Sequence, residues 1–295
     1  MTQKPLPSFF LDSTKLFKIA NARRDEFAAA KPFPHIAIDN FLPNEIAMRL
    51  FREFEAHDQR DWDLWGPGRA RHSENPEIEK TGTSREEYFS PLTRFIMLQF
   101  NSQTFIRFLE QITGHTGLLG DPYYNGCGLH STGRGDSLMI HIDSNRYPIK
   151  TPRIHQILNC IFFVNHGWKE SYGGHFELWD AKGKNCVSKV LPKFNRLLIF
   201  ETGTQSYHGH PEPLTCPVGR RRNSLAAYFY KIDRPLGGSY AGFQKQVTWL
   251  PRTAEESRLI LRHRIIDGMN RFVPPIIFDV KDAVTNWLAR KRAIK

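Results

Sequence analysis

The spacing of apolar and polar side chains changes along the chain and predicts where helices give way to strands. Residues 33–42 alternate in part and predict a first strand. Residues 43–55 carry apolar side chains at helical spacing and predict a helix. A serine and a proline at positions 90–91 are typical of a helix start, and helical structure is expected up to residue 113.

Between these helices, residues 57–87 are polar and rich in Gly, Arg, Glu and Asp, which predicts a long loop. Long loops in compact domains are often lids or binding loops. Trp62 and Trp65 lie in it, and we expect them either to cover a substrate or to anchor the loop on the core. Trp65 is therefore a candidate substrate contact.

From about Gly117 the pattern changes to short segments of period two, broken by Gly, Asn, Asp and Pro. Strands are predicted at residues 137–143, 155–165, 175–179, 187–191, 196–200 and 224–231. This series predicts an α+β, mainly β protein. Its core would be a double-stranded β-helix (jelly roll), with N-terminal helices packed on one sheet.

The C-terminal segment has a different pattern. Thr253 and Glu256 fit a capping box that starts a helix to about residue 272, and two prolines at 274–275 must end it. A second helix is predicted over residues 279–292. The chain is therefore expected to divide into a jelly-roll domain with helical support (1–248) and a basic C-terminal helical hairpin (249–295).

The charge balance favours an acidic partner, since the 295 residues carry a net charge of +11. Residues 249–295 are the more basic part, with ten Lys/Arg against five Asp/Glu. No apolar run approaches the length of about 18 residues that a membrane span needs, and no secretory signal is visible. The four cysteines form no C-x-x-C pair, which favours a reduced, cytoplasmic protein.

One histidine–carboxylate pair, His141 and Asp143, lies in a predicted strand and is followed far downstream by His208. Residues two apart in a strand point to the same side, so the pair shares one cavity. The intervening 65 residues leave room for a neighbouring strand to return His208 to it. Two imidazoles and one carboxylate form the facial ligand set of non-heme iron(II) oxygenases.

Two alternatives stay open for the ligands. His210 has the same strand parity as His208 and could replace it. His175 and Glu177 repeat the H-x-D/E spacing, but they follow two glycines and leave few residues before His208. The second pair is therefore expected to be structural or to face the substrate.

Arg222 and Ser224 share one face of a predicted apolar strand shortly after the last ligand. The planar guanidinium of Arg222 suits bidentate binding of a carboxylate. The alternative is a solvated basic turn at residues 220–222, and Arg220 and Arg221 are expected to be solvated.

Ordered blocks over residues 32–231 carry a family resemblance. They are KPFPHIAIDNFL from Lys31, FLEQITG from Phe108, LMIHID from Leu138, NCIFFVN from Asn159, YGGHFELW from Tyr172, and RLLIF from Arg196 through His208 to Arg222-Asn-Ser. The chain resembles the iron(II)/2-oxoglutarate-dependent oxygenases of the prolyl-4-hydroxylase-like superfamily.

The resemblance implies roles for these residues. His141, Asp143 and His208 would bind iron(II), and Arg222 would bind the 5-carboxylate of 2-oxoglutarate. O₂ would be the cosubstrate, and ascorbate is expected to support turnover. Because Asp143 keeps its carboxylate, hydroxylation is expected.

The resemblance also shows a departure from the family pattern. A tyrosine that often touches 2-oxoglutarate is replaced, since the strand carries Phe162 and Phe163 instead. Tyr124 or Ser224 is expected to supply the missing hydrogen bond.

Three further histidines, His130, His155 and His175, are candidates to line the pocket. For each, the alternative is an ordinary core or surface histidine.

The substrate expected from the resemblance and the charge is the Kdo (3-deoxy-octulosonic acid) sugar of lipopolysaccharide. The basic C-terminal hairpin would then bind the anionic inner face of the inner membrane, or else pack on the core. The runner-up is a peptidyl or amino-acid (prolyl-type) hydroxylase. A nucleic-acid partner is not expected, because no base-stacking aromatic loop accompanies a basic groove. Outside the enzymes, an inactive jelly-roll binding module is the alternative.

Overall fold

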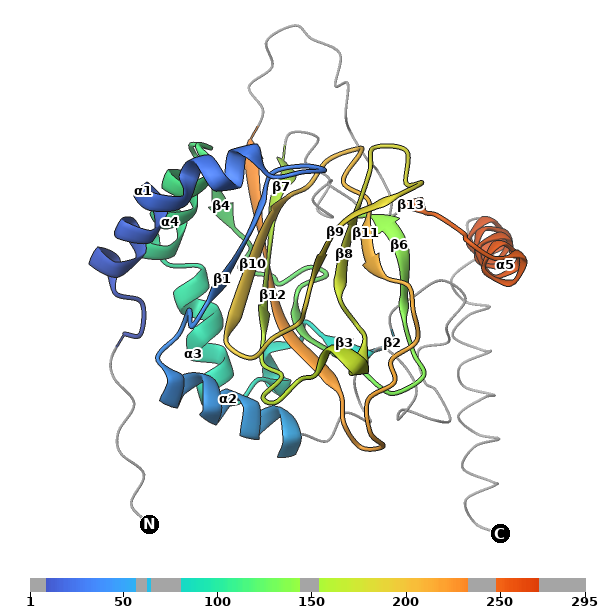
Figure 1. The fold of residues 1–295 in the computed structure, drawn as a ribbon, viewed down its shortest axis with the longest axis horizontal. Coiled ribbons are helices and arrows are strands. Elements are labelled where there is room, and N and C mark those ends of the chain that lie inside the picture. The colour runs from blue at the N-terminus through green and yellow to red at the C-terminus, as the bar shows by residue number, and fades with distance from the viewer. Residues whose placement is uncertain (1–8, 57–62, 65–80, 144–153, 233–247, 271–295) are drawn as a thin grey trace, which may run out of the picture. The chain divides into compact units, whose positions relative to one another are not determined.

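The computed structural model describes residues 9–56, 63–64, 81–143, 154–232 and 248–270. The chain forms two compact units, residues 1–250 and 251–295. In the first unit, two antiparallel sheets lie face to face, and helices cover the outer face of the larger sheet (Figure 1). This arrangement confirms the predicted α+β jelly roll.

The larger sheet has eight strands among the described residues. Its order is β1 (His35–Asp39), β10 (Arg196–Glu201), β7 (Ile154–Phe163), β12 (Arg222–Ile232), β5 (Gly128–Thr132), β3 (Thr81–Thr83) and β2 (Asp63–Leu64), with β4 (Leu119–Gly120) also paired to β12. The longest strands, β7 and β12, lie side by side at its centre.

The smaller sheet has five strands within the described part of the chain. Its order is β13 (Thr248–Trp249), β6 (Leu138–Ile142), β11 (His208–His210), β8 (Phe176–Trp179) and β9 (Cys186–Val190). Strands β6 and β11 are neighbours although about 65 residues separate them. This pairing positions the candidate site.

The helices of the first unit are α1 (Ser13–Ala29), α2 (Asn44–Ala56), α3 (Pro91–Phe100) and α4 (Gln103–Thr113), with short 3₁₀ turns η1 (Glu86–Tyr88) and η2 (Glu170–Tyr172). Ser90 caps α3 as expected, and its hydroxyl accepts a hydrogen bond from the amide of Thr93. Helix α1, which was not predicted, buries Leu16, Ala20 and Phe27.

Alternation along β7 divides the core into two parts. Leu158 and Phe162 face the helices and join the helix-side core, which the helices and the outer face of the larger sheet form together. Ile161 and Phe163 face the other sheet and join the inter-sheet core, with Phe176, Leu178, Val190, Leu198 and Phe200. Of the two phenylalanines singled out in the sequence, only Phe163 therefore faces the space between the sheets.

The predicted loop over residues 57–87 is only partly described. Residues 81–83 form strand β3, which pairs with β5, so this end of the segment is sheet rather than loop. Trp62 and Trp65 lie outside the described residues. Their predicted role remains a prediction.

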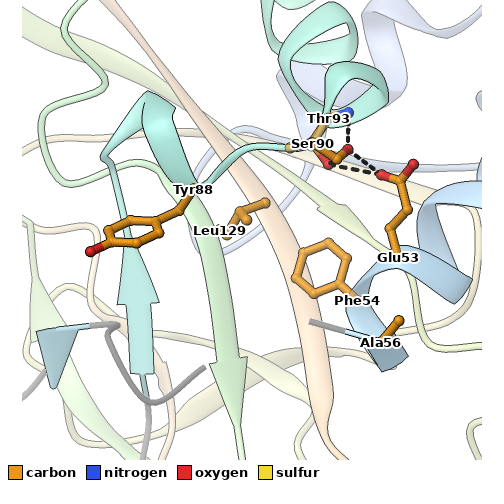
Figure 2. A pocket seen from close by; sticks show the side chains of 7 residues that line it. All are labelled: Glu53, Phe54, Ala56, Tyr88, Ser90, Thr93 and Leu129. Atoms are coloured by element: carbon orange, nitrogen blue, oxygen red, sulfur yellow. Dashed lines mark hydrogen bonds between the residues drawn. The ribbon is translucent and has the colours of Figure 1, made fainter. Parts of the chain in front are cut away.

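A pocket of about 210 Å³ opens where α2, η1 and the start of α3 meet (Figure 2). Its lining residues are Glu53, Phe54, Ala56, Tyr88, Ser90, Thr93 and Leu129. The carboxylate of Glu53 accepts hydrogen bonds from the hydroxyls of Ser90 and Thr93, which ties α2 to the first turn of α3. Leu129 belongs to the helix-side core, so the pocket lies away from the inter-sheet face.

In the second unit, α5 (Ala254–Asn270) begins with the predicted capping box. The amide of Glu256 donates to Thr253 Oγ1 at 3.1 Å, and the amide of Thr253 donates to Glu256 Oε2 at 3.1 Å. The second predicted helix, 279–292, lies outside the described residues. Among the helices that are described, none has both the length and the apolarity to cross a bilayer.

Candidate metal centre

The antiparallel pairing of β6 with β11 places His141 directly opposite His208. Asp143 follows the end of β6. Its Oδ1 lies 3.3 Å from His141 Nε2, and its Oδ2 lies 3.5 Å from His208 Nε2. One potential ligand atom from each of the three residues lies within 4.8 Å of the other two. The structure therefore brings together the three residues that the sequence singled out.

Backbone carbonyls set the orientation of both imidazoles. Nδ1 of His141 lies 2.8 Å from the carbonyl oxygen of Met139, and Nδ1 of His208 lies 2.8 Å from that of Ser206. A carbonyl oxygen can only accept, so each Nδ1 carries the hydrogen and donates it. Nε2 is then the ring atom left to bind a metal, and in both histidines it lies toward Asp143.

The electrostatics of the cluster favour the protonation states that bind metal. Burial lowers the pKa of His141, and the nearby His208 acts in the same direction. Burial alone would raise the pKa of Asp143, but the two histidines together hold it well below its usual value. The Asp143 carboxylate is therefore held in its ionised form, which is the form that binds a metal.

Aromatic side chains fix the two imidazole rings. His208 stacks on Phe176 at 5.3 Å between ring centroids, and Phe200 meets it edge-on at 4.9 Å. The ring of Trp249 lies 4.9 Å from that of His141. Trp249 was assigned to the C-terminal segment from the sequence, but it lies in β13, which pairs with β6.

The alternative ligands lie outside this cluster. His210 is buried but pairs opposite Leu138, beyond a register shift in β11. The imidazole of His175 instead lies 2.6 Å from the carboxylate of Glu170. Glu177 forms a 2.7 Å ion pair with Lys189. Among the described His, Cys, Asp and Glu residues, only His141, Asp143 and His208 form a group suited to a metal.

Arg222 lies at the start of β12 and is buried against the inter-sheet core. Its guanidinium lies over the ring of Phe163 at 5.0 Å, and Nε donates to the carbonyl of Gly174 at 2.7 Å. Nη2 is buried and has no hydrogen-bond partner among the described residues. Burial lowers the pKa of Arg222 to about 9, so the group still carries its charge at neutral pH. An unpaired buried cation fits a carboxylate ligand.

The pairing of β12 with β5 places further polar side chains beside Arg222. Ser224, two residues along the same face, lies opposite His130, and both are buried. His155 lies toward the start of β7, opposite Lys231, and is half-buried. Of the histidines expected to line the pocket, His130 therefore shares a face with Arg222 and Ser224.

Tyr124 lies elsewhere. It is buried in the helix-side core, with its ring 5.5 Å from that of Phe89. This placement corrects the expectation that Tyr124 bonds the cosubstrate. Ser224, two residues along β12, shares a strand face with Arg222 and offers a hydroxyl there.

Arg220 and Arg221, which are expected to be solvated, also make hydrogen bonds. Arg220 donates to the carbonyl of His166, and Arg221 Nε donates to Ser131 Oγ at 2.7 Å. Both side chains tie the turn before β12 to neighbouring segments.

Sequence reasoning missed three residues of the site: Asn159, Tyr228 and Trp249. The amide of Asn159 donates to Asp143 Oδ2 at 3.2 Å, and Tyr228 lies opposite Asn159 in the β7–β12 pairing. The signal for Asn159 is a polar residue sharing strand parity with Phe163. The signal for Tyr228 is its parity with Arg222 and Ser224. Nothing in the local sequence points to Trp249.

Comparison with known proteins agrees with this geometry. Residues 127–230 match the family described as the 2OG-Fe(II) oxygenase superfamily. Among curated proteins, no sequence matches the chain.

Two of the solved structures that are similar to this chain are prolyl hydroxylases. One is a prolyl hydroxylase from Trichoplax adhaerens in complex with a hypoxia inducible factor peptide fragment. It is 18% identical with a TM-score of 0.50, over 77% of this chain and 96% of that one. The other is a Pseudomonas putida prolyl-4-hydroxylase, 16% identical with a TM-score of 0.49, over 72% of this chain and all of that one. At 18% identity, the likeness to the Trichoplax adhaerens protein concerns the fold alone.

Proposed function

We propose that this iron(II)- and 2-oxoglutarate-dependent dioxygenase is a hydroxylase whose iron is held by His141, Asp143 and His208. The observation that carries the proposal is the convergence of two imidazole Nε2 atoms and one carboxylate, with both Nδ1 atoms bonded to carbonyls. Three protein ligands leave positions open for 2-oxoglutarate and O₂.

Arg222 and Ser224 would hold the cosubstrate. The unpaired Nη2 of Arg222 would bind the 5-carboxylate of 2-oxoglutarate, and the Ser224 hydroxyl lies on the same strand face. Iron(II), when bound, supplies the activation of O₂ that is coupled to decarboxylation of 2-oxoglutarate. Asp143 keeps a carboxylate where related halogenases leave room for halide, which favours hydroxylation. Ascorbate would support turnover.

Gly174 offers a test of the cosubstrate site, because its backbone has φ +71° and a Cβ there would lie 2.9 Å from Arg222 Cδ and 2.5 Å from Leu214 Cδ2. The Gly174→Ala variant is expected to lose stability and to bind 2-oxoglutarate more weakly, because Arg222 must move. Gly219→Ala is the control, since Gly219 has φ +77° but nothing within 4 Å of a Cβ.

Both variants should lose about 1–2 kcal/mol of unfolding free energy from the left-handed backbone alone. Urea unfolding and equilibrium binding of 2-oxoglutarate measure the two effects. Equal affinities in the two variants would show that Gly174 does not position Arg222.

Two substrate classes deserve a direct comparison. A prolyl or other peptidyl residue is the first, supported by the fold shared with a prolyl hydroxylase that was captured with a peptide. The Kdo sugar of lipopolysaccharide is the second. No comparison with known proteins supports the Kdo sugar. The observation in its favour is the net charge of +11, which suits an anionic sugar.

If Kdo is the substrate, this chain would be a cytoplasmic protein that binds the inner face of the inner membrane. Its support in the second unit is α5, on which Leu261 is 60% and Ile265 53% exposed. Flotation with anionic vesicles tests this. The control is a protein truncated after Leu250, since Trp249 belongs to the first unit. Equal flotation of both proteins would remove the proposed role of the C-terminal segment.

The test of function measures succinate from 2-oxoglutarate with iron(II), with prolyl peptides and Kdo–lipid A supplied separately. Mass spectrometry of each substrate looks for a gain of one oxygen. We expect succinate from the wild type and none from His141→Ala. No succinate from the iron-loaded wild type with any substrate would favour the inactive binding module instead.

A further inference from the structure

Asn159 places an amide inside an apolar strand face. It lies in β7, is 3% exposed, and shares its face with Ile161 and Phe163 of the inter-sheet core. Burying an amide is unfavourable unless it is hydrogen-bonded. The bond that its Nδ2 makes is to Asp143 Oδ2, at 3.2 Å.

In that bond the amide nitrogen, not the amide oxygen, faces the carboxylate, so Asn159 is the donor and Asp143 Oδ2 the acceptor. The donor is neutral, so it orients the carboxylate without cancelling the negative charge that a cation would bind.

Asp143 needs such a partner because it lies beyond the last residue of β6. The ladder between β6 and β13 ends at Ile142, which pairs with Thr248. Within the described part of the chain, three side chains approach the carboxylate. His141 lies near Oδ1, whereas His208 and Asn159 lie near Oδ2.

We propose that Asn159 is a positioning residue of the iron site, which holds Oδ2 of Asp143 so that Oδ1 is presented to the metal. This inference rests on the proposed function. Outer-shell partners of this kind orient ligands, and their loss typically costs about 10–100-fold in metal affinity or activity.

Tyr228 is the cross-strand neighbour of Asn159. The two are direct partners across the central β7–β12 pair. Directly opposite side chains of a strand pair point to the same face of the sheet, so the Tyr228 side chain lies beside Asn159.

The experiment measures Co(II) binding without 2-oxoglutarate, by calorimetry and by the visible d–d spectrum of the metal. Asn159→Leu keeps the volume and removes the donor, and Asn159→Ala removes both. Both variants should bind Co(II) about 10–100-fold more weakly than the wild type, with an altered spectrum. A role in packing alone predicts that the leucine variant behaves as the wild type.

Asn165→Ala is the matched control. Asn165 lies just beyond β7 and is 2% exposed, but it bonds the carbonyl of Pro192 and the amide of Asn223 rather than Asp143. Thermal unfolding of every variant separates lost stability from lost metal. The control should lose stability and keep the wild-type Co(II) affinity.

These measurements distinguish the positioning role of Asn159 from the existence of the metal site itself. Wild-type affinity and spectrum in both Asn159 variants would overturn the role of Asn159 alone, provided that His141→Ala loses the metal. Failure of the wild type itself to bind Co(II), or retained binding in His141→Ala, would overturn the metal site.

Discussion

Replacing His208 by alanine is expected to abolish succinate formation. The side chain supplies one of three protein ligands, and its Nε2 is held toward Asp143 by the bond from Nδ1 to the Ser206 carbonyl. Loss of an outer-shell partner already costs about 10–100-fold, so loss of the ligand itself should lower activity by more than about 100-fold. Co(II) affinity should fall with it.

His210→Ala is the control that decides between the two histidines of β11. His210 is as buried as His208 and lies two residues along the same strand, but the register shift sets it opposite Leu138. This variant is expected to lose stability while it retains Co(II) binding and turnover per folded molecule. The reverse result, with His208→Ala active and His210→Ala metal-free, would make His210 the ligand.

The ligand triplet and the jelly roll could be predicted because both follow from local strand parity. His141 and Asp143 share a face for the same reason that Phe163 and Ile161 do, and period-two segments indicated most of the long strands. The return of His208 to the site needed only a strand pairing that the fold supplies.

The site residues that were wrongly predicted or missed depend on which segments pack against each other in the fold, and the local sequence does not show this. Tyr124 was proposed because its hydroxyl could bind 2-oxoglutarate. Its backbone has φ +52°, and its ring packs in the helix-side core. Trp249 reaches His141 through the pairing of β13 with β6, a contact between distant segments that no local pattern encodes. The short strand β11 carries Gly209 between two histidines and has no apolar alternation to reveal it.

Related proteins often have a tyrosine in this strand where this chain has Phe163, and this changes the groups that contact Arg222. A phenylalanine offers no hydroxyl, but its ring lies under the guanidinium at 5.0 Å, and the Gly174 carbonyl takes the bond from Nε. Orientation of the arginine therefore comes from a ring and a backbone oxygen. That leaves Nη2 for the ligand.

The second large effect is expected from Arg222→Met, which keeps an apolar side chain against Phe163 and removes the charge. Truncating one partner of a buried, hydrogen-bonded charge pair costs about 2–5 kcal/mol. At about 1.4 kcal/mol for each factor of ten, 2-oxoglutarate should bind roughly 30-fold to several thousand-fold more weakly. Calorimetry on the Co(II)-loaded protein measures this directly.

Stability gives an independent measure of the same site. In the wild type, 2-oxoglutarate should raise the unfolding temperature, because a ligand that binds only the folded state stabilises it. The shift should be much smaller in Arg222→Met at the same concentration. Co(II) binding should persist, because the three ligands are intact.

Arg221→Met is the control, since that side chain bonds Ser131 rather than facing Phe163. It should keep the wild-type shift with 2-oxoglutarate even if its own unfolding temperature is lower. If Arg222→Met retains wild-type affinity while Arg221→Met loses it, the 5-carboxylate lies on the other arginine, and the unpaired Nη2 of Arg222 has another ligand.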